Sequence, residues 1–162
     1  EKAQESANRL KAISNNQGRA AKVLGTVLAA RGQGEQAIEE FGKAIAKNPR
    51  DVEALLYRGR VYAMLSKPDE AIKDFDGVIA LVPDFVDPYL DKAEVFLVKK
   101  QPDSALEVYN QWLGKRPNDL RVLERRQALY KELGKLDEAL EDLKRIRQIK
   151  SSRKEDQESE KP

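Results

Sequence analysis

The side chains that could do chemistry in this sequence are carboxylates, lysines, tyrosines and hydroxyls. The 162 residues include 30 Lys and Arg and 28 Asp and Glu, but no His and no Cys. Without cysteine there can be no disulfide framework, thiolate zinc site or cysteine nucleophile. Without histidine, the commonest general base and metal ligand is missing. Any catalysis would therefore rest on the remaining groups.

No arrangement of these groups indicates an active site. Carboxylates are abundant, but no pair stands in an apolar setting of the kind that prepares a carboxyl group for acid–base catalysis. The turn Gly32-Gln33-Gly34 lacks the Lys-Ser/Thr that follows in a phosphate-binding loop. We therefore predict that the chain is not an enzyme and that it uses no metal and no cofactor.

A row of basic residues could instead bind nucleic acid. Arg58, Lys92 and Arg126 recur at one position every 34 residues, and such a row could follow the phosphates of RNA. However, acidic residues surround the row, and the formal net charge is only +2. Long basic side chains also often cover apolar surface with their stems. We therefore expect no binding of nucleic acid.

The 34-residue interval organises most of the chain. Three kinds of position recur together: a small residue, an aromatic or large apolar residue, and a closing proline. An internal period between 20 and 50 residues is typical of stacked supersecondary units. The recurring residues are Ala37, Ala71, Ala105 and Ala139, then Phe41, Phe75, Tyr109 and Leu143, and finally Pro49, Pro83 and Pro117.

Each period is predicted to form two helices joined by a short turn. In the second unit, residues 66–70 (Ser-Lys-Pro-Asp-Glu) separate two stretches with apolar residues at helical spacing. Pro68 and Pro102 are expected to open second helices, because proline needs no N–H in the first turn and the acidic residue after it faces the helix dipole. No run alternates with period two for long enough to predict a strand. The predicted fold class is all-α.

This arrangement resembles the tetratricopeptide repeat family. That family has large apolar, small and aromatic residues and a closing proline at fixed places in 34 residues. The resemblance implies a right-handed superhelical solenoid of antiparallel helix pairs. The matching residues are Leu24, Gly25, Ala37, Phe41, Ala44 and Pro49 in the first unit, Leu55, Gly59, Tyr62, Ala71, Phe75 and Pro83 in the second, and Tyr89, Ala93, Phe96, Ala105, Tyr109 and Pro117 in the third.

Four units are predicted, and a segment flanks them at each end. Residues 1–17 are expected to form an N-terminal helix, either the second helix of an earlier repeat or an unrelated cap. The polar segment 152–162 is expected to be a disordered tail. The predicted units are repeat 1 at 18–51, repeat 2 at 52–85, repeat 3 at 86–119 and an atypical repeat 4 at 120–151.

Two kinds of position carry expectations about packing. Gly25 and Gly59 are expected to let the first helix of a unit approach the second, whose facing alanines are also small. Trp112 stands where the first unit has Ala44. We expect Trp112 either to pack in the core or to form a partly exposed anchor for a partner, since aromatic residues are favoured at interfaces.

The resemblance also implies a concave groove, lined by first helices, that commonly receives a peptide or a helix of a partner protein. One helical face carries Asp87, Asp91 and Glu94. The basic residues of the neighbouring first helices are Arg60 on one side and Arg121 and Arg125 on the other. Asp87 could pair with Arg121 and Asp91 with Arg125 across adjacent helices, or the groove could select a ligand that carries both signs of charge. The partner-binding candidates are Lys22, Tyr57, Arg60, Asp87, Asp91, Glu94, Arg121 and Arg125.

The predicted function is a protein–protein interaction scaffold that binds a peptide or helix in this groove. The alternative is a structural module that self-associates through its repeat ends or convex face to form a homo-oligomer. No apolar run approaches the roughly 20 residues that span a bilayer, so no membrane insertion is expected. A soluble chain follows, with the cytoplasm slightly favoured as its compartment.

Overall fold

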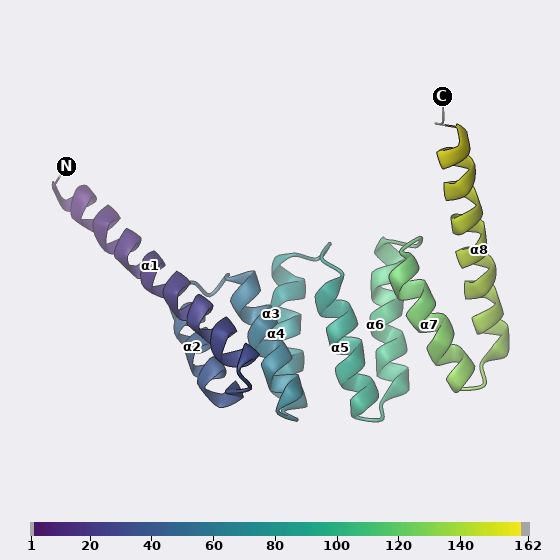
Figure 1. Ribbon diagram of the computed structural model, residues 1–162, viewed down its shortest axis with the longest axis horizontal. Coiled ribbons are helices and arrows are strands. Elements are labelled where there is room, and N and C mark those ends of the chain that lie inside the picture. The colour runs from purple at the N-terminus through teal and green to yellow at the C-terminus, as the bar shows by residue number, and fades with distance from the viewer. Residues whose placement is uncertain (1, 160–162) are drawn as a thin grey trace. The chain divides into compact units, whose positions relative to one another are not determined.

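A computed structural model describes the backbone of residues 2–159 and the side chains of residues 13, 14 and 16–153. Within residues 2–159 every regular element is an α-helix, so the all-α prediction is confirmed (Figure 1). The eight helices of this range are α1 (Lys2–Ala30), α2 (Gly34–Lys47), α3 (Val52–Met64), α4 (Pro68–Leu81), α5 (Asp87–Val98), α6 (Pro102–Lys115), α7 (Leu120–Glu132) and α8 (Leu136–Ser159).

The chain divides into two compact parts, which we call the N-terminal part (Glu1–Val95) and the C-terminal part (Phe96–Pro162). In the N-terminal part α1 packs on α2, α2 on α3, and α3 on α4. In the C-terminal part α6 packs on α7, and α7 on α8. Odd-numbered helices are the first helices of the predicted repeats and even-numbered helices are the second.

The four turns within the helix pairs share one backbone geometry. In each turn, the N–H of one residue donates to the carbonyl three residues back, and the next N–H donates to the carbonyl five residues back. This is the Schellman ending of a helix, which places one residue in the left-handed region. That residue is Gly32 (φ 75°), Ser66 (φ 57°), Lys100 (φ 57°) and Gly134 (φ 70°) in the four turns.

The helix starts follow the local sequence. Pro68 and Pro102 open α4 and α6 as predicted. The start of α3 is capped by Asp51, whose carboxylate accepts a hydrogen bond from the N–H of Ala54 at 3.0 Å. Asp51 thus satisfies an N–H group that α3 itself leaves without a partner, whereas Pro68 and Pro102 have no N–H that would need one.

Small residues allow close approach of the helices, as the sequence predicted. A Cβ atom added at Gly59 would lie 2.8 Å from Cε1 of Phe75, and one added at Gly25 would lie 3.0 Å from the ring of Phe41. Both rings are fully buried. The glycines of the first helices therefore leave the space that the aromatic rings of the second helices fill.

Trp112 is a core residue of the C-terminal part. Its side chain is 3% exposed, and its Nε1 donates a hydrogen bond to Oδ2 of Asp119 at 3.0 Å. The other carboxylate oxygen of Asp119 accepts from the N–H of Arg121 at the start of α7. The prediction that Trp112 packs in the core is confirmed, and the alternative of a partly exposed anchor is wrong. The indole is buried, and its N–H connects α6 to Asp119, the residue that caps α7.

Two helices differ from the sequence expectation at the ends. α1 runs without a turn from Lys2 to Ala30, so residues 2–17 do not form a helix separate from the first helix of repeat 1. α8 continues to Ser159, so residues 152–159 are helical where a disordered tail was expected. No proline interrupts either sequence, and residues 151–159 contain no glycine. Residue 1 and residues 160–162 lie outside the described range.

Candidate protein-binding surface

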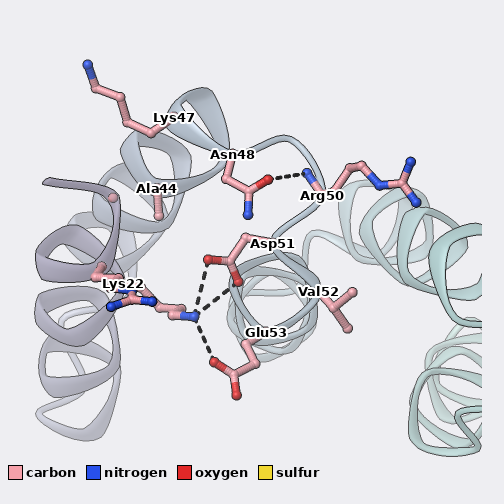
Figure 2. Close-up of a pocket in the computed structure, with 10 residues that line it drawn as sticks. Lys22, Ala44, Lys47, Asn48, Arg50, Asp51, Val52 and Glu53 are labelled. Carbon is pink, nitrogen blue, oxygen red and sulfur yellow. Dashed lines mark hydrogen bonds and ion pairs between the residues drawn. The ribbon is translucent and has the colours of Figure 1, made fainter. Parts of the chain in front are cut away.

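Lys22 connects the first helices α1 and α3. Its Nζ lies 2.7 Å from Oε2 of Glu53 and 3.2 Å from the carboxylate of Asp51. Figure 2 marks these contacts with dashed lines. Asp51 also caps α3, so one carboxylate both starts that helix and holds Lys22. Burial lowers the pKa of Lys22, but the hydrogen bonds to Glu53 and Asp51 outweigh it, so that its pKa lies above the ordinary lysine value.

These residues line a cleft of about 390 Å³ at the junction of α1, α2 and α3 (Figure 2). At its rim, the N–H of Arg50 donates to Oδ1 of Asn48 at 3.2 Å, which orders the loop between α2 and α3. Four basic side chains face two acidic ones, so the cleft carries a small positive excess. The lining residues are Gly18, Arg19, Lys22, Ala44, Lys47, Asn48, Arg50, Asp51, Val52 and Glu53.

Arg60 connects α3 to α5 in the same way. Its Nε lies 2.6 Å from Oδ2 of Asp91, and its Nη2 lies 3.7 Å from Oδ2 of Asp87. Three of the predicted site residues are therefore brought together. The pairs expected from the sequence, which would link these aspartates to Arg121 and Arg125, join the two parts of the chain and stay predictions.

Tyr57 lies between these two ion pairs along α3. It shares a helical face with Glu53 and Arg60, which stand four residues before it and three after it. Its ring is 37% exposed, and its centroid is 6.1 Å from that of Phe41. Tyr57 thus lies beside the buried Phe41 while part of the residue is exposed to solvent.

Met64 is an exposed apolar side chain on the same helix that the sequence analysis missed. It is seven residues after Tyr57, about two helical turns, and is 75% exposed. Methionine adapts its shape to a partner, and aromatic residues and methionine are enriched at protein interfaces. Its spacing of seven residues from Tyr57, which puts both side chains on one face of the helix, is the sequence signal that could have identified Met64.

The remaining candidates lie on α5 and α7. Glu94 is exposed on α5, one turn after Asp91. Arg121 and Arg125 are exposed on α7 in the C-terminal part, and Nε of Arg121 lies 3.7 Å from the capping carboxylate of Asp119. The structure therefore groups six of the eight candidates in the N-terminal part and two in the C-terminal part.

The basic row is not a free cationic surface. Each of the three basic residues forms an ion pair with an acidic side chain of a second helix in its own part of the chain. The positive charge that would attract a phosphate is therefore already neutralised. The ion pairs are Arg58 with Asp74, Lys92 with Asp76, and Arg126 with Asp142, with nitrogen–oxygen distances of 2.8, 2.6 and 2.6 Å.

Helix pairs with a 34-residue period, small residues facing buried aromatic rings, and a charged face on the first helices define a helical-repeat protein. Two family models, both described as tetratricopeptide repeat, match residues 22–85 and 62–129. The chain belongs to the tetratricopeptide repeat family. Proteins of this fold are typically protein–protein interaction scaffolds and generally not enzymes. Within the described residues no helix is long and apolar enough to cross a membrane.

Solved structures share the fold at low sequence identity. One crystal structure of MamA is 24% identical with a TM-score of 0.74, covering 92% of this chain and 86% of that one. A second MamA crystal structure is 25% identical with a TM-score of 0.74, covering 90% and 79%. A tetratricopeptide repeat protein from Parabacteroides merdae ATCC 43184 is 24% identical with a TM-score of 0.61, covering 80% and 50%. No curated protein matches the sequence.

Proposed function

We propose that the chain is a scaffold that binds a peptide or helix segment of a partner protein across its first helices. The observation that carries this proposal is the position of Tyr57, half-exposed between the ion pair of Lys22 with Glu53 and that of Arg60 with Asp91. An aromatic ring framed by charges is the composition expected of a binding hot spot.

The ion pairs support binding by holding the surface ready for a ligand. Lys22 and Arg60 each span two successive first helices, so α1, α3 and α5 present their side chains in a fixed order. A surface that is already ordered loses less conformational freedom when a ligand binds, which favours affinity. Tyr57 and Met64 offer apolar contact, and the charges around them select the flanking residues of the ligand.

The charge around Tyr57 sets the chemistry of the ligand. On the α5 side, Asp87, Asp91 and Glu94 outnumber Arg60, whereas the cleft beside Lys22 has a basic excess. A ligand with an apolar residue between a basic and an acidic group would match both sides. Such complementarity mainly determines specificity and the rate of association.

Selection from a displayed library of random peptides against the folded chain tests this function. The expected peptides carry an apolar residue flanked by charges of opposite sign, and Tyr57→Ala should weaken their binding by about tenfold or more. Asp91→Arg should disfavour the basic residue of the ligand. Lys73→Glu reverses a charge on an exposed face of α4 and serves as the control.

Circular dichroism of each variant shows whether the fold is intact, since Asp91→Arg removes the partner of Arg60. Peptides that bind wild type, Tyr57→Ala and Asp91→Arg with equal affinity would contradict the proposed surface. Peptides that respond to Lys73→Glu instead would place the binding surface on the second helices.

A further inference from the structure

Equivalent positions of successive first helices differ sharply in exposure. Valine recurs at one register as Val27, Val61 and Val95. Val61 and Val95 are each 5% exposed, but Val27 is 41% exposed. Seven residues earlier in the repeat, Ala54 of α3 is fully buried while Ala20 of α1 is exposed. α1 therefore carries the surface that α3 buries, but the described chain places no helix over it.

The helix that covers this surface in the interior is the second helix of the preceding repeat. Ala54 and Val61 of α3 form one apolar cluster with Ala37, Phe41 and Ala44 of α2, and Ile38 packs against it. In the C-terminal part α6 packs on α7 at the same place in the repeat, where Val122 and Leu129 are buried. The complement of a first helix is thus a second helix with apolar residues at these positions.

α8 carries that complement at the other end of the chain. Leu140, Leu143 and Ile146 stand in the register of Ile38, Phe41 and Ala44 of α2. Leu140 is 48% exposed, although Leu106 at the same position of α6 is only 5% exposed. Leu136, one turn earlier, is exposed as well. Ile146 is already buried in the C-terminal part (6% exposed), so Leu136 and Leu140 form the uncovered apolar face of α8. We take this face as the second half of the junction whose first half is α1.

We propose that α8 of one copy of this chain packs on α1 of a second copy and reproduces the α2–α3 junction between molecules. A cleft of about 390 Å³ between α1 and α2 is the place for Leu140 of the other copy: Ala20, Ala21 and Leu24 supply its apolar lining, and Gln17, Glu40, Lys43 and Lys47 complete it. This association goes beyond the proposed function because it uses the two end faces and leaves Tyr57 accessible.

Such a contact is head-to-tail, because two different surfaces meet. Each copy can then contact two others, and assembly proceeds to chains or to a closed ring. The contact is weaker than the internal junction, since Arg147 stands on α8 where α2 has Ile45, which packs beside the core of the N-terminal part. One helix junction is also a small interface. Association is therefore reversible and depends on protein concentration.

Sedimentation velocity of the chain across a wide concentration range tests the association. Wild type is expected to shift to larger species as concentration rises. Val27→Arg on α1 and Leu140→Arg on α8 should each weaken association by about tenfold or more, because each puts a charge into an apolar contact. Val98→Arg adds the same charge at an exposed apolar site on α5, which belongs to neither α1 nor α8, and should leave association unchanged.

Mixing the two blocked variants separates this geometry from any other. Val27→Arg keeps an intact α8 and Leu140→Arg keeps an intact α1, so an equimolar mixture should form dimers and no larger species. Wild type that stays monomeric at all concentrations overturns the proposal. Unchanged association of either variant, or a mixture without dimers, overturns it too. Because all three substituted residues are exposed, thermal melting should show intact folds, and a variant that unfolds is replaced by Val27→Lys or Leu140→Lys.

Discussion

The carboxylate of Asp74 on α4 accepts two hydrogen bonds from the guanidinium of Arg58 on α3, from Nε to Oδ2 and from Nη2 to Oδ1, each at 2.8 Å. Asp74 is only 4% exposed, and the guanidinium lies 5.7 Å from the ring centroid of Tyr62. The hydrogen bonds to Asp74 raise the pKa of Arg58 against the opposing effect of burial. The two helices of repeat 2 are thus fastened by a planar, two-pronged ion pair.

The same arrangement recurs in repeat 4. Arg126 of α7 donates to both oxygens of the buried Asp142 on α8 at 2.9 and 2.6 Å, and lies 5.7 Å from the ring of Tyr130. It also bonds Asn110 of α6. A basic row that the sequence offered as a possible phosphate track therefore holds first helices to second helices.

Removal of the Asp74 carboxylate should destabilise the fold. Asp74→Ala leaves the half-buried guanidinium of Arg58 without its two acceptors, so we expect the free energy of unfolding to fall by about 2–3 kcal/mol. Asp76→Ala on the same helix removes an exposed partner of Lys92 and should cost less than about 1 kcal/mol. Urea denaturation of both variants measures the difference, and equal losses would show that burial of the pair has no energetic weight.

The double variant Arg58→Leu with Asp74→Ala checks the physical cause. Repeat 1 already has Leu24 at the position of Arg58, so leucine suits this register. We expect the double variant to be more stable than Asp74→Ala, because no charge is left without a partner. A double variant less stable than Asp74→Ala would mean that the stem of Arg58 contributes more than its charge.

Two of the four turn residues in the left-handed region should become more favourable as glycine. Ser66 and Lys100 occupy the position of Gly32 and Gly134, and a side chain there meets the carbonyl oxygen that follows it. Ser66→Gly and Lys100→Gly should each raise the free energy of unfolding by about 0.5–1 kcal/mol. This net gain is the backbone strain that glycine relieves, minus the cost of the greater conformational entropy that glycine gives the unfolded chain. Gly32→Ala should lower it. Thermal melts that move in the other direction would show that the side chains make compensating contacts.

Gly59 should tolerate no side chain. An alanine Cβ would lie 2.8 Å from Cε1 of Phe75 and 3.2 Å from Cβ of Asp74, so α3 and α4 would have to separate. We expect Gly59→Ala to lower the free energy of unfolding by about 1–3 kcal/mol. Gly42→Ala in the middle of α2 is the matched control, since the nearest atom to its Cβ is Nη1 of Arg58 at 3.9 Å. Alanine there should stabilise the helix by about 0.5–1 kcal/mol.

Features that depend on one position of the repeat could be predicted from the sequence. The existence of a turn between the two helices of repeat 2, the proline starts of α4 and α6, and the fit of Gly59 against an aromatic ring each follow from local geometry at a fixed spacing. The turn itself is shorter than the predicted segment 66–70, because α4 already begins at Pro68. The continuation of α1 through residue 17 could not be predicted from the repeat. Ala3 and Leu10 stand 34 residues before Ala37 and Ala44, a register that favours the second helix of an earlier repeat, whereas α1 is one continuous helix from Lys2 to Ala30.

The ion-pair partner of each basic side chain could not be predicted from the sequence. Arg58 and Lys92 share one register, yet Arg58 bonds Asp74 of its own repeat and Lys92 bonds Asp76 of the preceding one. The choice follows from repeat 3, where Val108 occupies the place of Asp74 and offers Lys92 no acceptor. Arg60 likewise had acidic residues on both sides of it. Long side chains reach several acceptors, so spacing alone does not decide between them.

The ion pair of Lys22 gives the fold a dependence on alkaline pH. Burial lowers the pKa of Lys22, but the hydrogen bonds to Glu53 and Asp51 more than compensate, and its pKa in the folded chain lies above the ordinary 10.5. The folded state therefore binds this proton more tightly than the unfolded state does. The stability that it contributes is complete below pH 10.5 and is lost as pH rises through the higher folded pKa.

Lys22→Met should remove this dependence while keeping much of the apolar stem of the side chain. The difference in free energy of unfolding between wild type and Lys22→Met is expected to be constant from neutral pH to about pH 10 and to shrink above it. Urea denaturation at closely spaced alkaline pH values measures it. Lys47→Met, at the rim of the same cleft, separates the loss of the ion pair from the loss of one positive charge. A difference that grows above pH 10 would contradict the sign of the shift, because it would mean that the unfolded chain holds the proton more tightly.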